Sequence, residues 1–249
     1  IKLNSKEYSL YYTRGVTTVL QKDFLGALDD LNKALELEQN YIFIYNFLGI
    51  AKANLNDYEG AIIDYNKAIK IDPTLPDPYF NIGTIKYNQN KLDEAIEFYN
   101  KCIDIDENYE KAYCQKALIE IIFENYKNAI KNFTKSLELN PMNAKSYNGR
   151  GYVYYVLKNY ESAINDLSKA TELSQSIPEA YCYLGLSIYK KDKNIDEALK
   201  NIEKSIEIND KFTLAYYHQG ILRENKDDYE GAIKAWEKCV ELDKIWEPM

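Results

Sequence analysis

The chain has 249 residues, of which 46% are hydrophobic and 28% charged, with only 6 prolines and 10 glycines. This composition is typical of a well-packed globular protein and excludes long disordered linkers. The net charge of -8 disfavours binding to nucleic acid or to an anionic membrane, because both require an excess of Lys and Arg. The chain has one histidine, His218, and its four cysteines form no CxxC pair, so we expect no metal and no cofactor. No apolar run approaches the roughly 20 residues of a membrane span.

An alanine recurs along the chain at a spacing of 34 residues, with one spacing of 35. These register alanines are Ala27, Ala61, Ala95, Ala129, Ala163, Ala198 and Ala232. A tyrosine precedes each of them by 16 residues, or by 17 in the sixth unit. These register tyrosines are Tyr11, Tyr45, Tyr79, Tyr113, Tyr147, Tyr181 and Tyr216. The period predicts seven consecutive repeats, at residues 8–41, 42–75, 76–109, 110–143, 144–177, 178–212 and 213–246.

Each repeat has the pattern of two helices, and no segment is typical of a strand. In the second repeat, Tyr45, Leu48 and Gly49 share one face of a first helix, and a second helix follows from Tyr58. A helix-capping Asp or Asn precedes every second helix except the third, which has Lys91. The predicted caps are Asp23, Asp57, Asn125, Asn159, Asn194 and Asp228. The extra residue of the sixth repeat falls within 190–194 and predicts a longer turn between its helices.

Small residues at fixed positions predict how the two helices of a repeat pack. A Gly or Ala follows each register tyrosine by four residues, and the register alanine faces it from the second helix. A second small side chain follows each register alanine by seven residues, and there we expect Cys102 and Cys239 to be buried packing residues. One helix pair cannot bury its apolar face alone, so the repeats must stack to form a core.

This pattern resembles the tetratricopeptide repeat family over residues 8 to 246. The matching positions of the second repeat are Tyr45, Leu48-Gly49, Ala61, Tyr65, Ala68 and Pro73. The family has Trp where all seven repeats here have the register tyrosine. The resemblance implies an all-α fold, a right-handed superhelical solenoid of helix–turn–helix repeats forming a single repeat domain over 1–249. The similar RNA-binding pentatricopeptide repeat is disfavoured by the acidic charge.

The resemblance also implies a binding site, because the first helices of tetratricopeptide arrays line a concave groove that holds a peptide or a partner helix. Carried over position by position, the groove residues are Tyr12, Asn46, Phe80, Asn81, Lys111, Cys114, Gln115, Lys145, Asn148, Tyr152, Tyr183 and Tyr217. Ile50 and Thr84 lie one helical turn beyond Asn46 and Phe80. The family's two-carboxylate clamp for chaperone tails needs Lys, Asn and Arg in three successive repeats, and no three repeats here supply that set.

The sequence thus predicts a non-catalytic, cytoplasmic scaffold or adaptor that binds a protein or peptide partner in its groove. Two alternatives stay open: a regulatory or substrate-recruiting region of a larger enzyme, and a self-assembling structural array. The last repeat bears on the second alternative, because Trp236, Val240 and Trp246 have no predicted helix after them. Either the protein continues, or these side chains bind a partner or a second copy of the chain.

Overall fold

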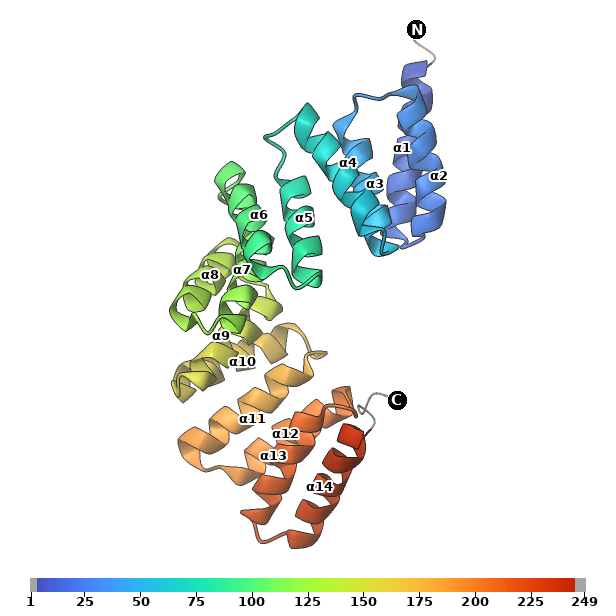
Figure 1. Ribbon diagram of the computed structural model, residues 1–249. Coiled ribbons are helices and arrows are strands. Elements are labelled where there is room, and N and C mark those ends of the chain that lie inside the picture. Colours follow the sequence, from blue (N-terminus) through green and yellow to red (C-terminus); the bar gives the residue numbers. More distant parts are fainter. Residues whose placement is uncertain (1–3, 245–249) are drawn as a thin grey trace. The chain divides into compact units, whose positions relative to one another are not determined.

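The computed structural model describes residues 4–244, with side chains from 7 to 242, and within these limits it contains fourteen helices and no strand (Figure 1). The all-α prediction is confirmed. Fourteen helices are the number expected for seven helix–turn–helix repeats, while the limits of the individual repeats stay a prediction. The chain divides into two compact units, one up to Lys116 and the other from Ala117, and the division lies within α7, Glu110–Ile122.

The first unit is built from three helix pairs and the beginning of α7. Its helices are α1 Asn4–Leu20, α2 Phe24–Leu37, α3 Ile42–Asn54, α4 Tyr58–Ile71, α5 Pro76–Asn88 and α6 Leu92–Ile105. The two helices of each pair pack together, and α2 and α4 also pack against the first helix of the following pair. Apolar side chains are buried in one cluster between α1, α2 and α3 and in another between α4 and α5, to which α3 and α6 add partly buried side chains.

The second unit repeats this arrangement. Its helices after α7 are α8 Tyr126–Leu139, α9 Ala144–Val156, α10 Tyr160–Leu173, α11 Pro178–Asp192, α12 Ile195–Ile208, α13 Thr213–Glu224 and α14 Tyr229–Lys244. Each helix from α8 to α13 packs against the next one in sequence. The last pair, α13 and α14, has one neighbouring pair within the described residues.

The predicted packing of small residues is confirmed. Every register alanine is at most 1% exposed. Gly49 lies against the ring of Tyr65, and a methyl group at position 49 would overlap with that ring. The helices of a pair therefore approach closely because one of them lacks a side chain at the contact.

Most of the predicted caps are confirmed as well. Backbone N–H groups three residues on donate to the side chains of Asp23, Asp57, Asn159, Asn194 and Asp228, at 2.9 to 3.3 Å. Asn125 makes no such bond, nor does Lys91. Each turn within a repeat also contains one residue in the left-handed region, with φ between 57° and 65°. These residues are Lys22, Asn56, Asn90, Glu124, Lys158, Lys193 and Asp227.

Two sequence expectations are wrong. The extra residue of the sixth repeat lengthens α11 to 15 residues and leaves only positions 193 and 194 between α11 and α12. A regular helix absorbs an added residue with a backbone hydrogen bond, so the turn does not grow. Cys239 is half-buried, whereas Cys102 is fully buried, because no described helix follows α14 to cover it. Trp246 lies outside the described residues.

Among the described helices, none is long and apolar enough to cross a bilayer.

Candidate peptide-binding groove

In the first unit, two of the predicted groove residues meet across neighbouring repeats. Asn81 on α5 donates from Nδ2 to Oδ1 of Asn46 on α3, at 3.3 Å. Asn46 is only 7% exposed, whereas Asn81 is partly exposed. Asn46 therefore orients the Asn81 amide, and Asn81 is the member of the pair that a partner can reach.

A hollow of about 200 Å³ lies beside Asn81, between α3, α4 and α5. Its lining residues are Ile50, Ala53, Asn54, Tyr58, Tyr65, Asn81, Thr84, Ile85 and Asn88. Ile50, Asn81 and Thr84 are residues that the sequence placed in the groove, so the structure brings these three together. Three neutral amides around apolar walls provide donors and acceptors for a peptide backbone without requiring a charged ligand.

Two groups of aromatic side chains in the first unit include the predicted groove residues Tyr12 and Phe80. The Tyr12 ring lies 5.0 Å from Tyr41, in an edge-on arrangement, and 6.0 Å from Phe47. Burial, together with Tyr41, raises the pKa of Tyr12 to about 12, so its phenol stays protonated and can donate a hydrogen bond. Phe80 packs between Tyr99 and Tyr109, with ring centroids 5.6 and 5.2 Å away.

The predicted groove residues at the end of the first unit differ in what they offer a partner. Lys111 is exposed and lines a hollow of about 290 Å³ that also contains Asp77 and Asp106. These carboxylates offset the positive charge of Lys111. Cys114 is 4% exposed and presents little surface. Gln115 is partly exposed, yet its Oε1 is buried, with no hydrogen-bond donor among the described residues.

In the second unit, the predicted groove residues are mainly aromatic. The ring of Tyr183 lies between Tyr152 and Tyr155, and its centroid is 4.9 Å from that of Tyr152 and 5.3 Å from that of Tyr155. Burial raises the pKa of all three phenols. Nearby on α9, Asn148 has a buried Oδ1 that no described group bonds. Lys145, also on α9, is exposed.

Tyr217 on α13 is the most accessible of the predicted groove tyrosines, with 49% of its surface exposed. Its ring contacts His218, with centroids 5.1 Å apart. Burial, together with Lys190, lowers the pKa of His218, so the neutral imidazole is favoured. The Tyr217–His218 pair is therefore an uncharged aromatic surface near neutral pH.

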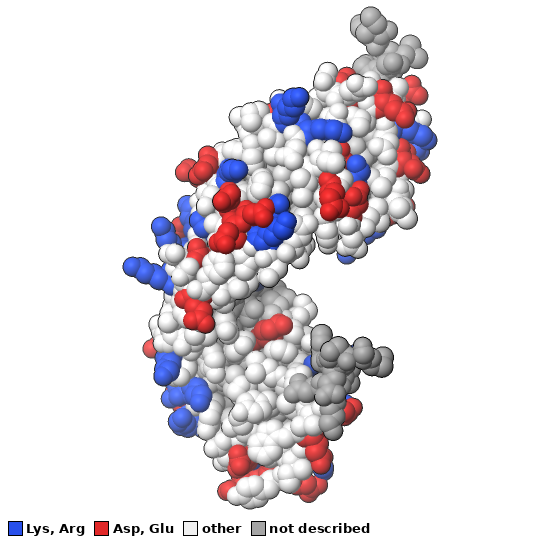
Figure 2. Space-filling model, viewed as in Figure 1, with Lys and Arg blue, Asp and Glu red and all other residues white. Residues whose placement is uncertain are grey.

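Charged side chains form no single large patch of one sign on the face shown in Figure 2, where red and blue residues are interspersed. Within the described part of the chain, no group of three His, Cys, Asp or Glu side chains is placed to hold a metal ion.

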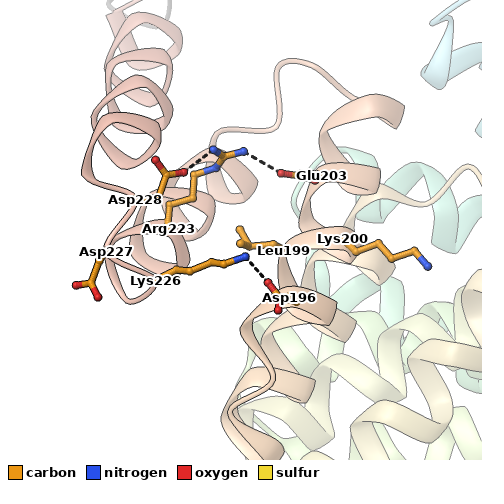
Figure 3. Close-up of a pocket in the computed structure, with 8 residues that line it drawn as sticks. All are labelled: Asp196, Leu199, Lys200, Glu203, Arg223, Lys226, Asp227 and Asp228. Carbon is orange, nitrogen blue, oxygen red and sulfur yellow. Dashed lines mark hydrogen bonds and ion pairs between the residues drawn. The ribbon is translucent and has the colours of Figure 1, made fainter.

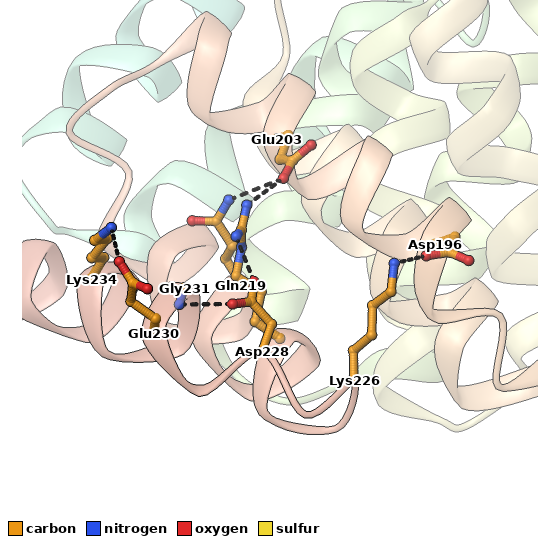
Figure 4. Close-up of polar contacts among 9 residues, drawn as sticks. Asp196, Glu203, Gln219, Lys226, Asp228, Glu230, Gly231 and Lys234 are labelled. Atoms are coloured by element: carbon orange, nitrogen blue, oxygen red, sulfur yellow. Dashed lines mark hydrogen bonds and ion pairs between the residues drawn. The ribbon is translucent and has the colours of Figure 1, made fainter.

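The structure also contains a charged hollow that the sequence patterns did not reveal. It has a volume of about 450 Å³, and its lining residues are Asp196, Leu199, Lys200, Glu203, Arg223, Lys226, Asp227 and Asp228 (Figure 3). Arg223 lies between Glu203 and Asp228, at 3.0 and 2.8 Å, and Lys226 pairs with Asp196. Figure 4 shows that Gln219 also donates to Glu203, at 3.5 Å. Arg223 and Lys226 are both paired with carboxylates, so this network joins α12 to α13 and to the α13–α14 turn. Its contacts with α12 join residues that are 16 to 30 positions apart in sequence, beyond the reach of helix spacing rules.

Stacked helix pairs with small residues at their contacts define the chain as an α-helical repeat protein. Family models described as "TPR repeat" match residues 53–89 and 151–192, and those described as "Tetratricopeptide repeat" match 76–109, 110–143, 178–212 and 214–245. The chain belongs to the tetratricopeptide repeat family. The resemblance seen in the sequence is confirmed.

Several solved structures share this fold, whereas no curated protein matches the chain. YrrB, described as a TPR protein with an unusual peptide-binding site, is 26% identical, with a TM-score of 0.60 over 72% of this chain and 91% of that chain. The MamA protein is 26% identical, with a TM-score of 0.58 over 70% of this chain and 96% of that one. A TPR repeat-containing protein from Cytophaga hutchinsonii, 21% identical, has a TM-score of 0.67 over 94% and 95%.

Proposed function

We propose that this chain is a non-catalytic interaction scaffold whose first helices hold a peptide or helix of another protein. The observation that carries this proposal is the hollow beside Asn81. It combines three amides with apolar walls, and three of the residues that the repeat register assigned to the groove lie in its lining.

The polar groups of the site suit the backbone of a peptide better than a charged side chain. The hollow carries the side-chain amides of Asn54, Asn81 and Asn88, and each amide has both N–H donors and a carbonyl acceptor. A peptide backbone presents both an N–H and a C=O group, so it can pair with these amides without any charged group. The expected partner is therefore an extended or helical segment that presents N–H donors and apolar side chains.

The comparisons support the same kind of function. YrrB is described by its peptide-binding site and is 26% identical to this chain. Tetratricopeptide repeats generally serve as non-catalytic scaffolds, so we assign the chain a binding role.

The test is a selection of peptides from a random display library on the wild-type chain, repeated on two variants. Asn81→Arg places a long cation in the hollow, whereas Asn66→Arg makes the same change on the exposed surface of α4. Peptides selected on the wild type are expected to bind Asn66→Arg equally and Asn81→Arg at least about tenfold more weakly. Equal binding to all three proteins places the ligand elsewhere and contradicts the proposal.

A further inference from the structure

The second helices have a face that the next repeat covers, and no helix of the described residues covers the same face of α14. Two positions on each second helix define this face: the residue directly after the register alanine and the residue eight positions after it. In the six second helices before α14, both side chains are buried or half-buried. On α12 these residues are Leu199 and Ile206, which pack against α13. On α14 they are Ile233 and Val240, which are 55% and 51% exposed. With Trp236 they line a hollow of about 620 Å³.

Helix α1 has the complementary face, also uncovered. Two positions on each first helix define this face: the residue directly before the register tyrosine and the residue six positions after that tyrosine. In the six first helices that follow α1, both residues are buried. Ile44 on α3, for example, is fully buried in a cluster with Leu31 of α2. The α1 residues at these positions are Leu10, 71% exposed, and Thr17, also exposed.

The hydroxyl of Thr17 is compatible with burial. Its Oγ1 donates to the Thr13 carbonyl within α1, at 2.8 Å. Ser187 occupies the same position on α11, makes the same bond to the Tyr183 carbonyl at 2.7 Å, and is fully buried. A hydroxyl bonded in this way leaves no unsatisfied donor when another helix covers it.

A polar contact also recurs between consecutive repeats. Three residues after the register tyrosine, a long polar side chain bonds the residue that stands five positions after the preceding register alanine. The bonds are Lys116 to Asn100 at 2.7 Å, Arg150 to Thr134 at 3.0 Å and Gln219 to Glu203 at 3.5 Å.

The two ends of the chain carry the two halves of this contact. Arg14 on α1 has the position of Arg150, and Glu237 on α14 has the position of Thr134. Arg14 binds Asp30 through Nε and Nη2, as Arg150 binds Asp166. In Arg150, the remaining Nη1 group donates to Thr134 of the preceding repeat. In Arg14, the same group would donate to the Glu237 carboxylate of another copy of the chain. The two ends thus carry opposite charges at matching positions, beside the exposed apolar residues Leu10, Ile233 and Val240.

We propose that copies of this chain stack head to tail, with α1 of one copy packed on α14 of the next in the register of consecutive repeats. Leu10 and Thr17 cover Ile233, Trp236 and Val240, and Arg14 pairs with Glu237. Each copy keeps one face of each kind, so the contact is heterologous and can propagate. This inference does not depend on the groove.

Sedimentation equilibrium of the full chain tests this proposal with two single variants. Leu10→Glu places a carboxylate in the apolar face of α1, and Ile233→Glu places one in the apolar face of α14. Leu25→Glu and Ile63→Glu are matched controls, because Leu25 is 68% exposed and Ile63 is 56% exposed on other surfaces. All four substitutions are at exposed positions, and thermal melts monitored by circular dichroism check that the variants are folded.

The wild type and both controls are expected to associate with rising concentration, and each test variant alone is expected to stay monomeric. An equal mixture of the two test variants should form a one-to-one dimer and nothing larger, because it retains one intact pair of faces. A wild type that stays monomeric up to about 1 mM overturns the proposal, and so does a mixture that fails to dimerise. Association that survives Leu10→Glu but not Ile233→Glu shows α14 pairing with a second α14 and also overturns it.

Discussion

Arg150 and Asp166 form a two-point ion pair between the helices of one repeat. Nε and Nη2 of the guanidinium lie 2.7 and 2.9 Å from the two carboxylate oxygens, and the side chains are 17% and 9% exposed. Arg14 and Asp30 form the same pair in the first repeat, where the Arg14 side chain is 65% exposed. The repeated structure therefore offers one interaction in two solvent environments.

We predict that Arg150→Ala lowers the free energy of unfolding by about 3–5 kcal/mol, because it leaves the buried Asp166 carboxylate without its partner. Arg14→Ala is expected to have a smaller effect. Asp30 is as buried as Asp166, with 9% of its side chain exposed, but the Arg14 side chain is 65% exposed, so its removal opens the Asp30 carboxylate to water. Urea unfolding of both variants measures the difference. Equal losses would contradict the assignment of this effect to burial.

Burial of His218 predicts a pH dependence of stability. The pKa of His218 is lowered in the folded protein, so the unfolded chain binds a proton more readily and stability falls as the pH falls. The loss begins near the unfolded pKa of about 6.5 and is complete below the lower folded value. His218→Gln should remove this dependence. NMR titration of the single histidine gives its folded pKa directly, and a value above 6.5 would reverse the prediction.

The left-handed residues of the turns predict a stabilising substitution. Lys158 has φ of 61° and is exposed, so Lys158→Gly relieves backbone strain without removing a buried contact. The strain of about 1–2 kcal/mol outweighs the entropy cost of glycine, and we expect a gain of up to about 1 kcal/mol. Asn56→Gly should change stability less, because Asn tolerates this conformation. A lower urea midpoint for Lys158→Gly would contradict this explanation.

The register alanines predict a sharp contrast within α6. Ala95 is fully buried at the contact between helices, so Ala95→Leu overpacks the core and should cost about 1–3 kcal/mol. Glu97, two residues later, is exposed, and Glu97→Leu should stay within about 0.5 kcal/mol of the wild type. Thermal unfolding of the two variants compares them. A similar melting temperature for Ala95→Leu and the wild type would show that the register is wrong.

The sequence was sufficient to predict the helices, the packing alanines and five caps, because each of these features depends on residues within one or two helical turns. It wrongly predicted a longer turn at 190–194, because spacing alone does not show whether an added residue extends a helix or a turn. Contacts between repeats could not be predicted in this way. The bond from Asn81 to Asn46 spans 35 residues and depends on how two first helices are placed side by side. The same holds for Arg223 with Glu203, and for the burial of Cys114.

A crystal structure of the chain bound to a selected peptide tests the central claim, the binding of a partner by the first helices, most directly. The account predicts a peptide lying over α3 and α5, with its backbone bonded to the Asn81 amide and an apolar side chain in the hollow beside it. A peptide bound to the outer surfaces of α4 and α6, with Asn81 untouched, would contradict it.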